Sequence, residues 1–224
     1  TPPVTPPTSA PPVPLLLQIE VKFAGTSVAH HEQPILPGAA FDVLLAPPDV
    51  AFWFPAAPAL YTVEVRLLAG GRMIASATHR TGFRQLAAQG EQLLLNGDPI
   101  CLRGALSWGW NPAVIVPWYT ADQARAELRT LRAMGFNLVK LCLFIPNQVY
   151  YDVADEEGML LWQEWPLWLP EVTTELRACA PSEYAEYMQL TRSHPSFVIY
   201  SLGCELDSSV DRPLLQELDG VAVH

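Results

Sequence analysis

Hydrophobic and polar positions alternate in short runs over the first third of the chain. The runs LLLQIEVKF, AAFDVLLA, LYTVEVRLL and RMIASATHR keep a partial period of two, which predicts β-strands at residues 15–23, 39–46, 60–68 and 72–80. Turn-forming residues separate the runs, and Gly70-Gly71 stands where a hairpin turn is expected. A small β-sandwich over residues 15–86 is therefore predicted, although it has fewer strands than the about seven of a complete immunoglobulin-like domain.

From about residue 85 onward, segments with a helical period alternate with almost continuously apolar runs. Asn96-Gly97 is a strong hairpin signal between two short strands. Thr120 and Gln123 form a capping box that opens a helix, and Gly135 can end this helix in the left-handed conformation. Further helices are expected over residues 150–157 and 182–192, and buried strands are expected to start near residues 100, 136, 159 and 197. This spacing is typical of βα units.

About four successive βα units over residues 87–224 predict either a doubly wound sheet or the N-terminal half of a (β/α)8 TIM barrel. A whole barrel takes about 250 residues, so a barrel here would be partial. Residues 1–14 are rich in proline and are expected to form an extended linker, which suggests that another segment precedes it.

Charge and cysteine content narrow the classes of partner. The chain has 13 basic and 23 acidic residues, for a net charge of −10, which argues against a nucleic acid or an anionic membrane as partner. The sequence has no apolar run long enough to span a bilayer. Its four cysteines are far apart, so no metal-site spacing and no cofactor are indicated, and buried thiols are expected.

Residues that follow the strands are the candidates for chemistry, because active sites of βα folds lie at the carboxyl ends of the strands. Five of the seven tryptophans fall in these loops, where an indole could stack on a sugar ring or could simply pack a loop. Glu164 and Glu205 follow consecutive strands, and paired carboxylates serve acid/base and nucleophilic work at acetals. The candidate substrate-binding residues are Trp108, Trp110, Asn111, Lys140, Glu164, Trp165, Trp168 and Cys204.

Several motifs then carry a resemblance to glycoside hydrolase family 2, which includes β-galactosidases, β-glucuronidases and β-mannosidases. The run FWFPAAPALY from Phe52 resembles the family's LWSPExPxLY, and TGFR followed by LNGDPICLRG is similar to GFR…LNGKPVxLRG. MGFNLVK resembles MGxNxVR, YDVADEEG resembles YDLCDExG, and HPSFVIYSLGCE resembles HPSVIxWSLGNE. The matches occur in family order from residue 52 to residue 205, which chance does not explain.

The resemblance implies an immunoglobulin-like sandwich followed by a TIM barrel, with Glu205 as the acid/base. It also implies that the nucleophile, a second Glu after the seventh strand, lies outside this chain, and that Glu164 lines the site. Two positions depart from the family pattern: Cys204 replaces an Asn that binds the sugar 2-hydroxyl, and Lys140 replaces an Arg. His194 is expected to be structural.

Three functional hypotheses remain. The first is a retaining β-glycosidase of carbohydrate substrates, of which this chain alone would be inactive because it holds one of the two catalytic carboxylates. The second, favoured by Cys204 and Lys140, is a non-catalytic carbohydrate-binding or pseudo-enzyme module. The third is a half-barrel that pairs with another chain, because an isolated half-barrel exposes two sheet edges, so a homo-oligomer stays open.

Overall fold

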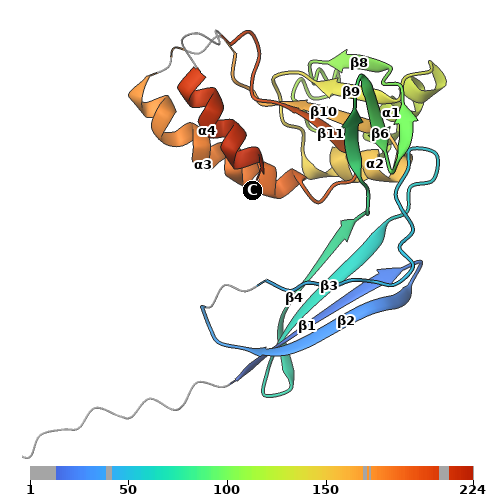
Figure 1. The fold of residues 1–224 in the computed structure, drawn as a ribbon, viewed down its shortest axis with the longest axis vertical. Coiled ribbons are helices and arrows are strands. Elements are labelled where there is room, and N and C mark those ends of the chain that lie inside the picture. Colours follow the sequence, from blue (N-terminus) through green and yellow to red (C-terminus); the bar gives the residue numbers. More distant parts are fainter. Residues whose placement is uncertain (1–13, 39–41, 169–170, 172, 207–211, 224) are drawn as a thin grey trace, which may run out of the picture. The chain divides into compact units, whose positions relative to one another are not determined.

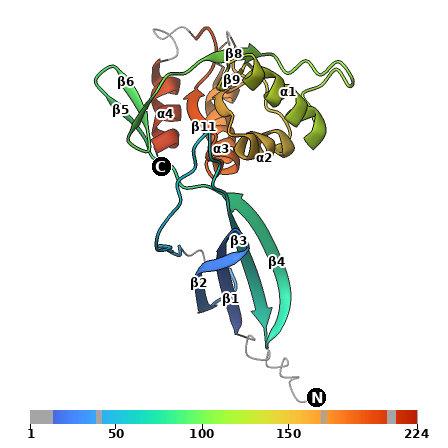
Figure 2. The ribbon, with the colours of Figure 1, turned by 90° about the vertical axis from the view of Figure 1, so that its right-hand side faces the viewer.

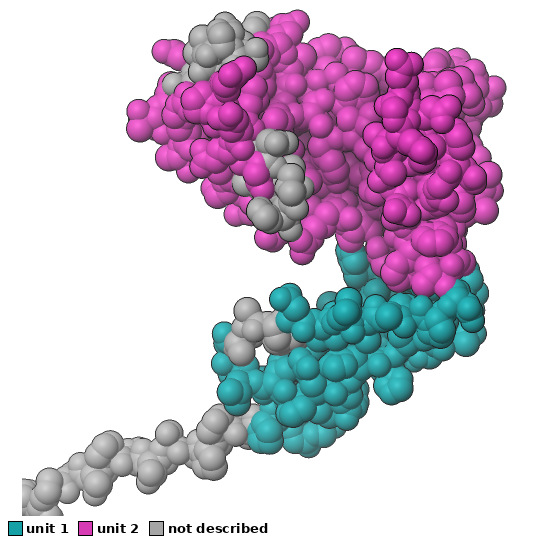
Figure 3. Space-filling model, in the orientation of Figure 1, with its two compact units in different colours: residues 1–49, 61–79 teal, residues 50–60, 80–224 magenta. Residues whose placement is uncertain are grey.

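The computed structural model describes residues 14–38, 42–168, 171, 173–206 and 212–223, so the predicted linker over residues 1–14 falls almost wholly outside it. The chain forms two compact units, which Figure 3 colours separately. The first comprises Thr1–Asp49 and Tyr61–His79, and the second comprises Val50–Leu60 and Arg80–His224. None of the described helices is long and apolar enough to cross a membrane.

The first unit contains a four-stranded sheet in the order β2-β1-β3-β4 (Figure 1). Its strands are β1 (Leu15–Phe23), β2 (Thr26–Ile35), β3 (Tyr61–Ala69) and β4 (Arg72–Thr81). β1 pairs antiparallel with both β2 and β3, and its alternating apolar side chains are matched across the sheet by those of β3. The turn between β3 and β4 is Gly70-Gly71, both with positive φ, as the hairpin signal predicts. This sheet fits the expected β-sandwich domain.

Two details of this unit differ from the sequence prediction. Residues 42–46, the described part of the strand predicted at 39–46, form no strand. The neighbour of β1 is instead β2, whose centre, AHHEQ, is too polar to show the strand period. β2 forms because the two-residue turn at Ala24 and Gly25, both with positive φ, folds the chain back onto β1.

The second unit is built on a parallel four-stranded sheet in the order β11-β10-β9-β8 (Figures 1 and 2). The strands are β8 (Gly104–Ser107), β9 (Leu138–Leu141), β10 (Leu160–Glu164) and β11 (Phe197–Ser201). They are the four strands that the apolar runs predict, and three of them begin one to four residues after the predicted start. A separate antiparallel sheet holds β5 (Leu86–Gln89), β6 (Gln92–Leu95) and β7 (Asp98–Ile100), with the predicted turn at Asn96-Gly97.

A helix follows each parallel strand: α1 (Ala121–Ala133), α2 (Gln148–Glu157), α3 (Thr174–Thr191) and α4 (Arg212–Val223). The capping box of α1 forms as predicted between Thr120 and Gln123. Gly158 ends α2 in the left-handed conformation. α3 begins eight residues before the predicted start at 182, because it accommodates Pro181 inside the helix. α3 and α4 lie side by side (Figure 1) and share an apolar cluster.

The segment Val50–Leu60 packs with the parallel sheet although it precedes β3 in sequence. Trp53 is fully buried against Leu138, Leu160 and Val198, at the amino ends of the strands, and its Nε1 donates to the carbonyl of Asp155 at 2.9 Å. Trp53 thus closes the end of the sheet opposite to the predicted site. The division at residues 86/87 stays a prediction, and the structure adds that residues 50–60 belong spatially with the second unit.

Strand alternation gives the parallel sheet two different faces. Val139, Leu141 and Leu161 face the cluster formed with α1 and α2. Residues of the opposite alternation, Lys140 and Trp162, are register partners on the other face. That face is apolar at the amino ends of the strands and becomes polar toward their carboxyl ends, which is where a site can form.

Candidate functional site

An ion pair lies at the carboxyl end of the sheet, between β9 and β10. The Nζ of Lys140 stands 2.6 Å from Oε2 of Glu164, and the Sγ of Cys142 donates to Oε1 of Glu164 at 3.0 Å. Glu164 is only 2% exposed, so both of its oxygens are bound inside the protein. This arrangement fixes the carboxylate and directs its charge toward Lys140.

Lys140 is held from a second side by an aromatic ring. Its Nζ lies 4.8 Å from the ring centroid of Trp162, whose Nε1 donates to the hydroxyl of Ser201 at 2.7 Å. Burial alone would lower the pKa of Lys140, but the hydrogen bond and the charge of Glu164 outweigh it, so the pKa is raised above the ordinary 10.5. Lys140 is therefore a fixed positive charge at the mouth of the sheet, with 23% of its side chain exposed.

Glu205 lies in the loop after β11, and its carboxylate is exposed. Its Oε2 accepts a hydrogen bond from the Nε1 of Trp168 at 2.7 Å, which joins the loops that follow β10 and β11. The backbone of Glu205 has φ 52°, in the left-handed region that a side chain with a Cβ rarely adopts. Strain of this kind clusters at functional sites.

The thiol of Cys204 lies close enough to Glu164 and Glu205 for both charges to act on it. Burial raises the pKa of its thiol, and the negative charges of Glu164 and Glu205 raise it further. Its thiol is therefore protonated at neutral pH, a weak donor and acceptor at the position where the family pattern has an amide. The structure thus brings together four predicted site positions, Lys140, Glu164, Cys204 and Glu205, and links Trp168 to the last of them.

The other predicted residues lie differently. Trp108 and Trp110 are exposed in the loop after β8. Asn111 is buried and stabilises this loop, since its Nδ2 donates to the carbonyl of Trp118 and its Oδ1 accepts from the backbone of Ala113. The binding roles of these three residues remain predictions.

Trp165 is 7% exposed and belongs to the cluster formed by α3 and α4. Its ring meets that of Tyr184 edge-on at 5.4 Å. Its assignment to substrate binding stays a prediction that this burial does not favour. His194 is also buried, with Nδ1 at 2.5 Å from Oδ2 of Asp155, at the amino end of β11. This is the structural position expected for it.

Three neighbours of the ion pair were not among the predicted site residues: Cys142, Trp162 and Ser201. A signal for Cys142 was present, because it follows the apolar strand by one residue and shares the face of Lys140. Trp162 and Ser201 lie within strands that read as wholly buried, so nothing local marked them. Within the described ranges, no group of three His, Cys, Asp or Glu residues could hold a metal ion.

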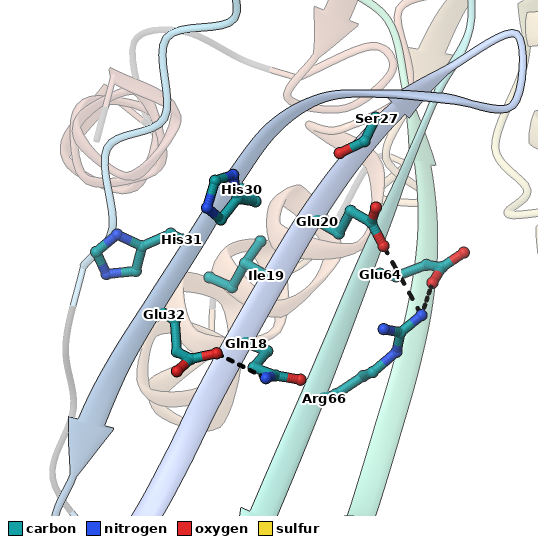
Figure 4. A pocket seen from close by; sticks show the side chains of 9 residues that line it. All are labelled: Gln18, Ile19, Glu20, Ser27, His30, His31, Glu32, Glu64 and Arg66. Carbon is teal, nitrogen blue, oxygen red and sulfur yellow. Dashed lines mark hydrogen bonds and ion pairs between the residues drawn. The ribbon is translucent and has the colours of Figure 1, made fainter.

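A second polar surface lies on the sheet of the first unit, in a hollow of about 260 Å³ (Figure 4). Its charged groups are already paired. Arg66 bonds Glu64 on the same strand, and Glu64 also bonds Lys22 of β1 at 2.6 Å. Gln18 of β1 donates to Glu32 of β2. Because its charges are satisfied by one another, this hollow is less suited to chemistry than the carboxyl end of the parallel sheet.

Several proteins of known family have sequences similar to this chain. Residues 15–84 match the sequence model described as glycosyl hydrolases family 2. A putative β-glucuronidase of Formosa agariphila is 28% identical over 193 residues, which cover 83% of this chain and 18% of that protein. A β-galactosidase of Photobacterium profundum is 27% identical over 162 residues, covering 68% of this chain and 16% of that protein. The chain thus spans less than a fifth of the length of these relatives.

Solved structures agree in fold. A β-glucuronidase of Parabacteroides merdae superposes with a TM-score of 0.80 at 25% identity, over 93% of this chain and 29% of that one. A β-glucuronidase of Ruminococcus gnavus, solved in complex with D-glucuronic acid, gives a TM-score of 0.80 at 20% identity, over 92% of this chain and 35% of that one, which is a likeness of fold.

Proposed function

The chain belongs to glycosyl hydrolase family 2, and on that premise we propose that it is part of a retaining β-glycosidase in which Glu205 is the acid/base. The two relatives named above are glycosidases by name. In this proposal the four βα units of the second unit are the N-terminal half of a TIM barrel, and the nucleophile comes from outside this chain. The substrate is a carbohydrate.

The position of Glu205 carries the proposal. It is an exposed carboxylate directly after β11, at the end of the sheet where βα enzymes place their catalytic groups. In the first step its carboxylic acid gives a proton to the departing glycosidic oxygen while the nucleophile attacks the anomeric carbon. In the second step its carboxylate takes a proton from the water that releases the sugar.

Glu164 and Lys140 take supporting roles in this mechanism. Glu164 has both oxygens engaged and is buried, so it is not free to attack a sugar. Its charge is offset by Lys140, which leaves Glu205 as the exposed carboxylate of the cluster. Lys140 in turn keeps a positive charge facing the region where negative charge would be carried by the nucleophile.

Kinetics of the longer protein that contains this chain test the acid/base role. For Glu205→Gln we expect a large loss of kcat on aryl β-glycosides with poor leaving groups, which need protonation. A small loss of the glycosylation rate is expected on dinitrophenyl glycosides, whose leaving group needs no acid. The matched control is Glu183→Gln, an exposed carboxylate on α3. Equal losses on both substrates, or none, would refute the assignment.

Retention and the location of the nucleophile need separate experiments. Proton NMR of the first-formed product should show the β-anomer. The chain of 224 residues should not turn over aryl β-glycosides, because a covalent intermediate needs the second carboxylate. Robust turnover by this chain would contradict the proposal.

A non-catalytic carbohydrate-binding module is the second candidate, and Cys204 favours it. In this chemistry the hydrogen bond from an Asn side chain to the sugar 2-hydroxyl strengthens in the transition state. A thiol is too weak a donor and acceptor to replace that hydrogen bond. Calorimetric binding of a β-glycoside by the longer protein without any hydrolysis would select this candidate over the enzyme.

A further inference from the structure

The indole of Trp168 makes its hydrogen bond to one specific oxygen of Glu205. Nε1 of Trp168 donates to Oε2 at 2.7 Å. An indole N–H is only a donor and has no lone pair with which to accept a proton. Oε2 must therefore act as acceptor in this contact, whatever the protonation state of the carboxyl group.

The loops that carry the two residues are fastened to each other by their backbones. The N–H of Cys204 donates to the carbonyl of Leu167 at 2.8 Å, and Trp168 and Cys204 form a parallel β-bridge. The loops approach so closely at Gly203 that an added Cβ would stand 2.6 Å from the oxygen of Leu167. Trp168 and Glu205 thus project from two backbone segments that are already fastened together, which lowers the entropic cost of their hydrogen bond.

The left-handed backbone of Glu205 points to the same conclusion. A left-handed conformation is unfavourable for a residue with a Cβ, so it persists where the surroundings impose it. Here the backbone is fixed at Cys204, the residue before Glu205, and the carboxylate of Glu205 is bound by the indole of Trp168. The side chain is thereby held at both its backbone and its tip.

We propose that Trp168 is a positioning residue that selects which oxygen of Glu205 carries the catalytic proton. This inference rests on the proposed acid/base role of Glu205. With Oε2 occupied by the indole N–H, the acidic proton resides on Oε1. In the first step the Oε1–H bond breaks as the proton passes to the glycosidic oxygen, and in the second step a proton from water returns to Oε1. The indole keeps its proton throughout.

A role in sugar stacking alone predicts different behaviour. Trp168 is 60% exposed, so a stacked sugar is compatible with the hydrogen bond. Stacking stabilises substrate and transition state alike, so its loss raises KM. Orientation of the acid acts in the transition state, so its loss lowers kcat on substrates whose leaving group needs protonation. The two roles are therefore separable by experiment.

The first experiment needs no activity and uses the chain as it stands. In spectra of its 15N-labelled indoles, the signal of Trp168 is identified by its loss in Trp168→Phe. We expect this signal to shift in Glu205→Gln, because a neutral amide is a weaker acceptor than a carboxylate. The control signal is that of Trp53, which donates to the carbonyl of Asp155 and should stay in place. An unmoved Trp168 signal would overturn the proposal.

The second experiment uses the longer protein. Trp168→Phe should lower kcat about tenfold on glycosides with poor leaving groups, the value of one exposed charge-assisted hydrogen bond, and should leave the glycosylation rate on dinitrophenyl glycosides nearly unchanged. A rise of KM alone, or equal losses on both substrates, would refute the positioning role. If Glu205→Gln is itself fully active, the acid/base assignment fails, and the indole signal still reports whether Trp168 holds Glu205.

Discussion

Lys140 and Glu164 form a salt bridge of 2.6 Å across β9 and β10, with the carboxylate almost completely buried. Neither partner has another residue of opposite charge in the ion pairs found among the described residues. The same pair therefore contributes to the stability of the sheet and sets the charge of the candidate site.

Removal of the ammonium group should destabilise the protein. We expect Lys140→Met to lower the free energy of unfolding by about 2 kcal/mol, below the ~3–5 of a fully buried pair because Lys140 keeps partial contact with water. Denaturant titration followed by fluorescence measures this. The double variant Lys140→Met, Glu164→Gln should recover most of the loss, since no uncompensated charge remains, and a single variant as stable as the parent would contradict the prediction.

The contribution of this pair should depend on pH at the alkaline end. The pKa of Lys140 is raised in the folded protein above its ordinary 10.5. The folded state thus binds the proton more tightly than the unfolded state, so the stabilisation is complete below pH 10.5 and is lost as the pH rises through the folded-state pKa. The difference in unfolding free energy between the parent and Lys140→Met should therefore shrink as the pH rises through the folded-state pKa of Lys140. A difference that stays constant as the pH rises through this range would argue against this ion pair.

The exposed and the buried cysteines should differ in thiol reactivity. Burial, together with the hydrogen bond to Glu164, raises the pKa of Cys142 to about 12, so almost no thiolate is present at neutral pH. Cys101 and Cys179 are exposed. We expect iodoacetamide to label these two in the native protein and to leave Cys142 unlabelled, as measured by peptide mass spectrometry. Denatured protein, the control, should label at Cys142 too; equal native labelling would show that Cys142 is accessible.

Gly158 should tolerate no side chain. It ends α2 with φ 67°, and a Cβ there would collide with the backbone carbonyl of Pro55. The matched control is Gly135, which has φ 91° and, among the described residues, no neighbouring atom within 4 Å of the point that a Cβ would occupy. Gly158→Ala should therefore cost about 1–3 kcal/mol more unfolding free energy than Gly135→Ala, the usual cost of overpacking. Equal costs in thermal or denaturant unfolding would mean that Pro55 does not pack there.

Cys204 gives a test of whether the site is a weakened enzyme. In the longer protein, Cys204→Asn should raise kcat/KM on aryl β-glycosides about tenfold or more, because an amide can bond the sugar 2-hydroxyl in the transition state. Cys179→Asn, at an exposed thiol on α3, is the control and should change nothing. Unchanged kinetics in Cys204→Asn would show that the thiol at this position does not limit the rate.

Local signals in the sequence determined much of the fold. The capping box at Thr120, the stop at Gly158 and the hairpin at Asn96-Gly97 each act through backbone conformation and hydrogen bonds within a few residues, so a short stretch of sequence suffices to predict them. The order of βα units and the place of Glu205 after β11 follow from the same kind of signal together with the family motifs.

Only the tertiary structure decided which side chains contact one another in the candidate site. Cys142 and Glu164 are 22 residues apart and Trp168 and Glu205 are 37 apart, and nothing near either residue in sequence specifies the other. The burial of Trp53 beneath the parallel sheet is likewise a long-range contact. The sequence by itself determined which carboxylates stand at the strand ends. Only the packing of strands and loops decided that Glu164 is enclosed by Lys140 and Cys142 while Glu205 stays exposed beside an indole, because both depend on segments that meet only after folding.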